Sequence, residues 1–203
     1  MSGVDDAVAA IGVGVPVVLP FDTVYGLAAD PLSEEASRRL YLLKGREGSQ
    51  PSALVARRFD DLVECVPELR GDAEAIAQAL LPGAFTLVFA NPEHRFPWLT
   101  GSSPGTIGVR VPLLEGPGGD VLERVGVLVA TSANHPGERD PASLGEVPED
   151  VRVRAGAVVD GGRLAGVPST VIDLSGPEPR LLREGAVSAA EALGRVASAR
   201  SGV

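Results

Sequence analysis

The sequence predicts a single α/β domain built on a large, twisted, mixed β-sheet that is flanked by helices. Short runs rich in Val, Ile and Leu alternate along the chain with stretches whose apolar residues have helical spacing, and this alternation is typical of α/β domains. The chain has 203 residues, a length that suits one domain, and 44% of them are hydrophobic. Neither an internal repeat nor a long linker interrupts the pattern, so we expect one domain over residues 1–203.

Apolar runs and helix-ending residues indicate the elements of the first half. Gly12 and Pro82 are residues that end helices. Ser33 and Asp72 have the short polar side chains that cap helix N-termini. Helices are therefore predicted over 4–11, from Ser33 to Lys44 and over 73–81, and strands over 15–19 and 54–56.

Apolar alternation and continuous apolar runs predict six strands in the second half. Alternation places residues 106, 108 and 110 on one face of a strand. Ser188 and Glu191 form a capping-box pair at the start of the last helix. The predicted strands are 85–89, 107–111, 127–130, 158–159, 170–173 and 180–182, and the third of these is expected to deliver Thr131–Asn134 into a loop.

The composition excludes several functional classes. The formal net charge is −9, whereas a protein whose main task is to grip nucleic acid needs a basic face. Cys65 is the only cysteine, and with His94 and His135 alone beside it a Cys/His zinc site has too few ligands. No apolar run is long enough to span a membrane, and the N-terminal residues are acidic where a signal peptide is basic. We expect a cytoplasmic protein without a membrane partner.

Three polar clusters follow apolar elements, which is where open α/β sheets bind ligands. They are Asp22–Gly26, Lys44–Arg46 and Thr131–Asn134. Each also has a purely structural interpretation. The first and third clusters have the composition of turns, and a cation such as Lys44 at a helix end contributes under about 1 kcal/mol when it is exposed.

Six sequence blocks in a fixed order resemble the YrdC/Sua5 family. They read DTVYGLAAD from residue 22, LYLLKGR from residue 40 with Pro51 shortly after, GTIGVRVP from 105, TSAN from 131, PSTVID from 168 and LLREG from 181. The resemblance covers about residues 5–196. It implies a YrdC-like open mixed sheet with a central cleft, in the short form that lacks the C-terminal domain of Sua5.

The resemblance implies the activity of an L-threonylcarbamoyladenylate synthase. In that reaction the amine of threonine captures bicarbonate as a carbamate, which attacks the α-phosphate of ATP and releases pyrophosphate. The product serves N6-threonylcarbamoyladenosine formation at position 37 of tRNA, which downstream tRNA threonylcarbamoyl-transferase proteins complete. Mg²⁺ is expected with ATP, held by phosphate oxygens and water rather than by a metal site of the chain. No stable binding of tRNA is expected.

The resemblance also implies the roles of individual residues. Lys44 and Arg46 would supply the cations that phosphate transfer needs, and Arg110 would bind the carboxylate of threonine. The alternative for Arg110 is a buried salt bridge with an internal Asp or Glu. The implied catalytic residues are Lys44, Arg46, Ser132 and Asn134. The ATP-binding set is Lys44, Arg46, Gln50, Thr106, Ser132, Asn134, Asp140 and Arg183, and the threonine-binding set is Thr23, Val55, Arg110, Ala130 and Ser169.

Several positions depart from the usual pattern of that family. Phe21, Glu47, Val55, Pro136 and Asp140 replace the residue types that are common there, and Val55 stands where many members have a histidine near threonine. Asp140 brings a carboxylate towards the phosphates, which is unfavourable unless Mg²⁺ or an arginine offsets its charge. Two alternatives therefore stay open: a divergent paralogue like YciO with different nucleotide chemistry, and an RNA-binding module of the same fold.

Overall fold

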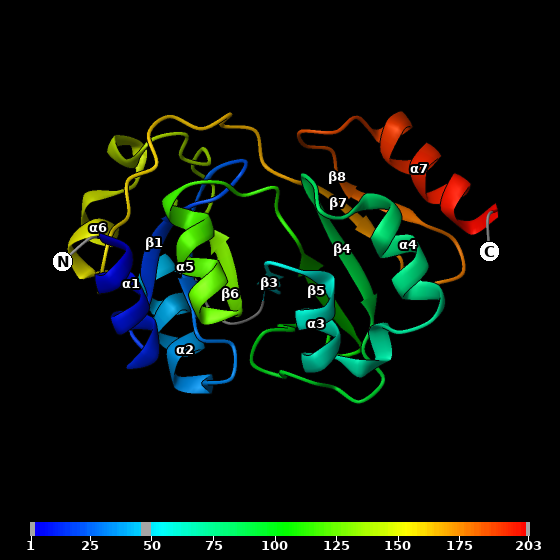
Figure 1. Ribbon diagram of the computed structural model, residues 1–203, viewed down its shortest axis with the longest axis horizontal. Coiled ribbons are helices and arrows are strands. Elements are labelled where there is room, and N and C mark those ends of the chain that lie inside the picture. The colour runs from blue at the N-terminus through cyan, green and yellow to red at the C-terminus, as the bar shows by residue number, and fades with distance from the viewer. Residues whose placement is uncertain (1–2, 46–49, 202–203) are drawn as a thin grey trace.

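One mixed sheet of eight strands forms the centre of the computed structural model, which describes residues 3–45 and 50–201 (Figure 1). The order across the sheet is β1-β2-β6-β3-β5-β4-β7-β8. β3 is parallel to β5 and β4 is parallel to β7, whereas the other neighbours are antiparallel. The strands are β1 (Val17–Pro20), β2 (Tyr25–Ala29), β3 (Ala53–Ala56), β4 (Phe85–Ala90), β5 (Thr106–Arg110), β6 (Val127–Ser132), β7 (Thr170–Asp173) and β8 (Arg180–Arg183). The prediction of an open mixed sheet is confirmed.

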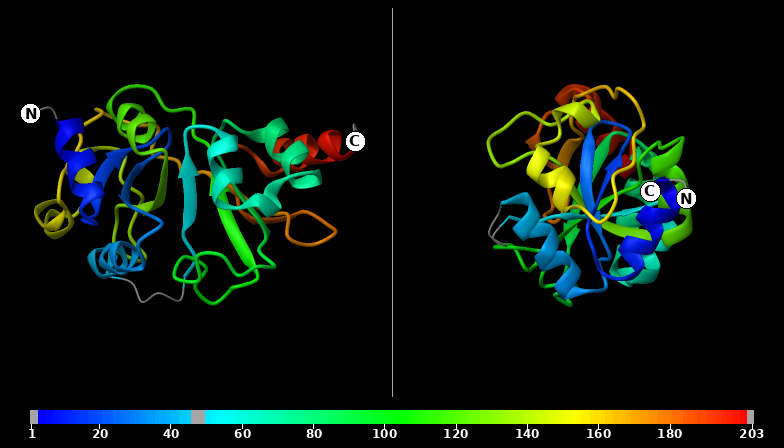
Figure 2. Two further views of the ribbon diagram at one scale, coloured as in Figure 1. Left: turned by 60° about the horizontal axis from the view of Figure 1, so that its bottom comes forward. Right: turned by 90° about the vertical axis from the view of Figure 1, so that its left-hand side faces the viewer.

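Helices pack on both faces of the sheet. α1 (Gly3–Gly12) and α5 (Pro117–Val125) pack against each other and against β1. The other helices are α2 (Glu34–Lys44), α3 (Phe59–Cys65), α4 (Asp72–Leu80), α6 (Glu149–Arg154) and α7 (Ala189–Ser201), of which α2, α3, α4 and α7 contact β2, β3, β4 and β7 respectively. Figure 2 shows α4 and α7 side by side near the C-terminus, at the opposite end of the molecule from α1. None of the described helices is long and apolar enough to cross a membrane.

Two hydrophobic cores result from this arrangement, one on each face of the sheet. Successive residues of β1 point to opposite faces, so that Val17 and Leu19 belong to the core under α1 and α5, whereas Val18 belongs to the larger core. The larger core extends from β2 to β7 beneath α2, α3, α4 and α7. The face that α1 and α5 cover at one end of the sheet carries a cavity over the central strands.

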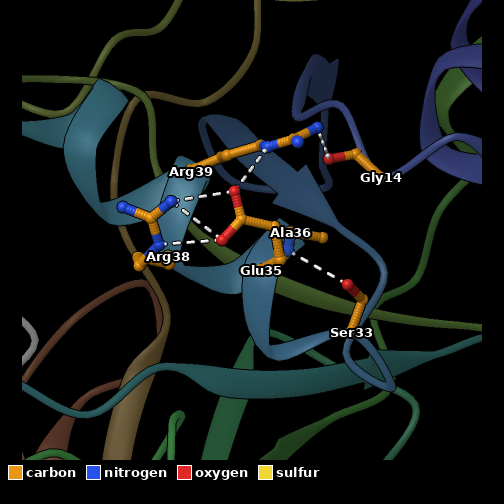
Figure 3. Close-up of polar contacts among 6 residues, drawn as sticks. All are labelled: Gly14, Ser33, Glu35, Ala36, Arg38 and Arg39. Carbon is orange, nitrogen blue, oxygen red and sulfur yellow. Dashed lines mark hydrogen bonds and ion pairs between the residues drawn. The ribbon is translucent and has the colours of Figure 1, made fainter.

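The start of α2 is the one that the sequence predicts (Figure 3). The side-chain oxygen of Ser33 accepts a hydrogen bond of 3.1 Å from the backbone N–H three residues further on, so it caps the helix. Glu35 in the first turn binds Arg38 at 2.8 Å and Arg39 at 3.1 Å, and Arg39 also donates to the carbonyl of Gly14. These ion pairs are exposed, so the cap and the buried face of the helix matter more for its stability.

The structure corrects several predicted boundaries. β6 runs to Ser132, so Thr131 and Ser132 lie in a strand rather than in a loop. The N-cap of α4 is Gly71 and not Asp72, which occupies the first helical position and makes no side-chain cap. Residues 158–159 contribute one isolated bridge, between Val158 and Val18, instead of a strand.

Four elements were not predicted from the sequence: β2, α3, α5 and α6. α5 begins with Pro117, Gly118 and Gly119, which have the composition of a turn. The reason lies in packing, since a Cβ on Gly118 would come within 2.1 Å of the carbonyl oxygen of Pro20 at the end of β1. The close approach of α5 to the sheet therefore requires glycine at this position.

Candidate functional site

A cavity of about 510 Å³ lies over the middle of the sheet. Alternate residues of adjacent strands form its floor, because alternate side chains of a strand point to the same face. β5 contributes Thr106, Gly108 and Arg110 together, as the alternation predicts. Other floor and wall residues are Ala53 and Val55 of β3, Thr86 and Val88 of β4, Ala130, Thr131 and Ser132 of β6, and Val171 and Asp173 of β7. The predicted central cleft is confirmed.

Arg110 lies at the end of β5 and has two partners from the loop between β1 and β2. Its Nη2 donates to a carboxylate oxygen of Asp22 and, at 2.8 Å, to Oγ1 of Thr23. Only 11% of the Arg110 side chain and 9% of the Asp22 side chain is exposed. The alternative interpretation of Arg110, a buried salt bridge, is therefore present, and the same side chain also lines the cavity.

Burial dominates the electrostatics of this ion pair. Burial lowers the pKa of Arg110, although the charge of Asp22 opposes this effect, and the charge of Arg183 lowers that pKa further. Burial also raises the pKa of Asp22 against the opposing charge of Arg110. Both directions have the same cause, because burial disfavours the charged form of each group. Arginine nevertheless keeps its proton in proteins, so Arg110 presents a guanidinium cation to the cavity that it lines.

Lys44 connects the end of α2 to the end of β6. The helix ends at Lys44, as the sequence predicts, and Gly45 follows as its C-cap with a φ of 67° that turns the chain. The ammonium group donates to the carbonyl of Ser132 at 2.7 Å, to its hydroxyl at 3.2 Å and to Oδ1 of Asn134 at 2.7 Å. The alternative interpretation of Lys44, an exposed cation at a helix end, is wrong, because only 5% of this residue is exposed.

The three side chains of this cluster have different positions relative to the cavity. Ser132 lines it, while Lys44 and Asn134 support Ser132 from behind. The hydroxyl of Ser132 also lies 2.6 Å from Oδ1 of Asn134, and the amide of Asn134 donates to the carbonyl of Glu138. The cluster therefore fixes the direction of the Ser132 side chain and places a buried positive charge next to it.

Arg183 reaches the cavity because β8 contains a bulge. The pairing of β7 with β8 shifts so that Val171 lies opposite Arg183 and Ile172 opposite Leu181. Leu182 is the extra residue of the bulge. Strict alternation would place Arg183 on the opposite face from Arg180 and Leu182, whereas all three line the cavity.

The Arg183 guanidinium is held by Ser169 at the start of β7. Its Nε and Nη2 donate to the carbonyl oxygen of Ser169 at 3.1 and 2.9 Å, and Nη2 lies 3.2 Å from the hydroxyl. That hydroxyl also shares a hydrogen bond of 2.8 Å with Oγ1 of Thr86. Ser169 is buried, so both predicted residues have defined positions on the cavity wall.

Of the remaining predicted residues, some line the cavity and others do not. Val55, Ala130, Thr106 and Asp140 line it, and the hydroxyl of Thr106 donates to the carbonyl of Ser103 at 3.1 Å. Gln50 is exposed and precedes Pro51, which lines the cavity. Arg46 and Glu47 lie outside the described residues.

Several charged groups in or next to the cavity were not given a role in the predicted substrate-binding sets. Asp22 is the partner of Arg110, and the sequence feature that indicates such a partner is an arginine in an apolar strand, which needs an anion when it is buried. Asp173, Ser175 and Arg180 form a second polar group on the wall, in which Asp173 accepts from both other side chains. Nothing in the local sequence distinguishes these three residues from an ordinary hairpin.

Metal-ligating residues do not gather in the described part of the chain: no three His, Cys, Asp or Glu residues there could hold one ion. Asp140 and Asp173 both line the cavity, but Asp173 is already bonded to Arg180 and Ser175. A divalent cation in this cavity would therefore depend mainly on oxygens of a bound ligand and on water.

The family model Sua5/YciO/YrdC, described as "Telomere recombination", matches residues 9–185. The chain belongs to this family. The resemblance of the six sequence blocks to YrdC/Sua5 proteins is thus confirmed, and all six lie within the matched residues.

Relatives of the Sua5/YciO/YrdC chain include named enzymes. Threonylcarbamoyl-AMP synthase of Pyrococcus abyssi is 36% identical over 177 residues, which are 85% of this chain and 51% of that protein. A putative threonylcarbamoyl-AMP synthase of Mycobacterium tuberculosis is 33% identical over 198 residues, 95% of this chain and 89% of that protein. The chain thus spans about half of the first relative and most of the second.

Solved structures of the family have the same architecture. Pyrococcus abyssi Sua5 complexed with L-threonine matches with a TM-score of 0.81 and 35% identity, covering 90% of this chain and 54% of that one. Escherichia coli YciO matches with a TM-score of 0.78 and 23% identity, covering 94% and 92%, and shares the fold.

Proposed function

We propose that the protein is an L-threonylcarbamoyladenylate synthase, which forms threonylcarbamoyl-AMP and pyrophosphate from L-threonine, bicarbonate and ATP. One observation carries this proposal: a single cavity has the buried cation Arg110 on one strand and Ser132, backed by Lys44, on another. The first group suits a carboxylate and the second suits phosphate oxygens. The names of the Pyrococcus and Mycobacterium relatives support the same activity.

Arg110 and its neighbours form the proposed amino-acid end of the cavity. Arg110 would bind the carboxylate of threonine, and the solved Pyrococcus complex with L-threonine supports this choice of ligand. Thr23 bonds to Arg110 and Ser169 bonds to Thr86, so both hydroxyls are held in place beside the site. Val55 and Ala130 supply apolar surface for the rest of the amino acid.

Lys44, Ser132, Asn134, Arg183 and Thr106 form the proposed nucleotide end. A carbamate oxygen attacks the α-phosphorus of ATP, the bond to the bridging oxygen breaks, and pyrophosphate leaves with the electron pair. Negative charge moves onto the leaving group during this step, and fixed cations and donors that face it lower the barrier. Arg46 would add a second cation, as the sequence predicts.

Mg²⁺ is proposed to enter with ATP as part of the substrate. It would be coordinated by phosphate oxygens and water, and the carboxylate of Asp140 also lines the cavity. The ion would reduce the charge repulsion between phosphate and Asp140. The protein itself would orient the triphosphate through Lys44, Ser132 and Arg183.

The cellular setting is proposed from the same activity. The product would pass to tRNA threonylcarbamoyl-transferase proteins, and the net charge of −9 argues against stable binding of tRNA. One cysteine in the whole sequence suits the reducing cytoplasm.

An assay of the complete reaction tests the proposal against both alternatives. Purified protein is incubated with ATP, Mg²⁺, bicarbonate and threonine, and pyrophosphate and the adenylate are detected by mass spectrometry. We expect both products only when all substrates are present. ATP binding without threonine binding at millimolar concentration would favour a divergent paralogue, and RNA binding that fades steeply with salt would favour an RNA-binding module.

A further inference from the structure

Asp22 is a buried carboxylate that the proposed reaction does not use directly. It lies in the loop between β1 and β2, and one of its oxygens accepts from Nη2 of Arg110 while the other lies 3.3 Å from the backbone N–H of Leu113. Asp22 therefore joins the loop to the chain just beyond β5. Its side chain is 9% exposed and does not line the cavity.

The direction of the Arg110 side chain depends on this contact. The guanidinium donates two hydrogen bonds from Nη2, one to Asp22 and one to Thr23, and its Nε is buried without a hydrogen-bond partner in the described structure. A long side chain that is bonded at one nitrogen alone keeps its orientation only while those bonds are made. The hydrogen bond to Asp22 has a charged acceptor, so it is stronger than the hydrogen bond to the Thr23 hydroxyl.

Asp22 also offsets positive charge close to Arg110. Arg183 is close enough to act on Arg110 electrostatically, so two cations face this end of the cavity. Asp22 is the carboxylate bonded to Arg110, and it leaves a net charge of about one positive unit for the three groups together. Without Asp22, two uncompensated guanidinium groups would lie on the same cavity wall.

We propose that Asp22 is a positioning residue for the amino-acid substrate: it holds the Arg110 guanidinium in its orientation at the cavity wall and offsets its charge next to Arg183. This inference rests on the proposed function, because it takes the amino acid to be the ligand of Arg110. Asp22 acts through Arg110 and does not touch the reacting atoms.

Asp22→Asn tests the inference, because it removes the charge and keeps the shape. We expect the KM for threonine to rise on the order of tenfold or more while the KM for ATP changes less than about twofold. Arg110→Lys should likewise raise the KM for threonine much more than the KM for ATP. The matched control is Asp61→Asn, which breaks an ion pair with Arg58 on α3, outside the cavity, and should leave both KM values unchanged.

Thermal unfolding of each variant separates positioning from loss of the fold. If Asp22→Asn does not fold, Asp22→Glu keeps the charge but displaces the guanidinium by one methylene group, and the KM for threonine alone should rise roughly threefold to tenfold. A folded variant whose two KM values change equally, or do not change at all, would overturn the inference about Asp22 but not the proposed function. Wild-type protein that neither binds threonine by calorimetry nor turns it over would contradict the proposed function, and the inference with it.

Discussion

The ammonium group of Lys44 has a structural and a proposed catalytic part to play. Lys44→Ala should cost roughly 2–4 kcal/mol of transition-state stabilisation, about 30- to 1000-fold in kcat/KM, by analogy with the loss of one fixed donor. The free energy of unfolding should also fall by about 1–3 kcal/mol, because the buried Asn134 oxygen loses its charged donor. Pyrophosphate release and urea unfolding measure the two effects.

Arg38→Ala is the control for Lys44→Ala, since Arg38 belongs to the same helix but is 61% exposed and pairs with Glu35. It should leave activity and stability nearly unchanged. The same loss of activity is expected for Arg46→Ala. Full activity in both Lys44→Ala and Arg46→Ala would show that the phosphate site is assigned to the wrong residues.

Asp140 should make nucleotide binding dependent on Mg²⁺. A carboxylate on the cavity wall repels uncompensated phosphate, so Asp140→Ser should bind metal-free ATP more tightly than the wild-type protein does. Binding of MgATP should change little. Calorimetric titrations with Mg²⁺ and with a chelator give both values, and a loss of MgATP binding in Asp140→Ser would instead identify Asp140 as a metal ligand.

At the scale of elements, α5 packs on β1 through Gly118. A Cβ at this position would overlap the carbonyl oxygen of Pro20, so Gly118→Ala should destabilise the fold by about 1–3 kcal/mol or more. Gly12→Ala at the end of α1 is the matched control, because a Cβ there meets no atom within 4 Å. Urea unfolding measures both variants, and equal stability of the two would contradict the packing argument.

His135 connects the segment after β6 to two helices. Its Nε2 lies 3.0 Å from Asp150 at the start of α6, and its Nδ1 lies 3.4 Å from the carbonyl of Lys44 at the end of α2. The hydrogen bond to Asp150 raises the pKa of His135 above its ordinary value. The stabilisation is thus fully present below the unfolded pKa of about 6.5 and is lost as the pH rises through the folded pKa.

The free energy of unfolding should therefore fall as the pH rises above about 6.5, and His135→Gln should reduce this dependence. Urea unfolding at several pH values in that range measures the slope for both proteins. Identical slopes would mean that the pair with Asp150 does not contribute in solution.

Elements with regular apolar spacing could be predicted, and those defined by distant packing could not. The capped helix that begins after Ser33 and the alternating strand β5 follow from local pattern. β2 starts inside the polar cluster of residues 22–26, and α5 starts with two glycines. Their formation depends on neighbours across the sheet, which no local window of the sequence contains.

At the scale of the whole molecule, the order of the strands determines the site. β3 lies between β6 and β5, so residues from four or more separate parts of the chain meet over the middle of the sheet. Blocks in the order of a known family predict which residues meet. They do not predict that Asp22 holds Arg110 or that Lys44 is buried behind Ser132, because those contacts join residues 88 positions apart.

Carbon-13-labelled bicarbonate provides the most direct test of the central claim, that this cavity joins threonine, bicarbonate and ATP. The wild-type protein is incubated with labelled bicarbonate, threonine and MgATP, and the adenylate is analysed by mass spectrometry. We predict an adenylate that contains the threonine and one labelled carbon, formed in equal amount with pyrophosphate and absent when threonine is omitted. Pyrophosphate release that does not depend on threonine, or an adenylate without the label, would contradict the account.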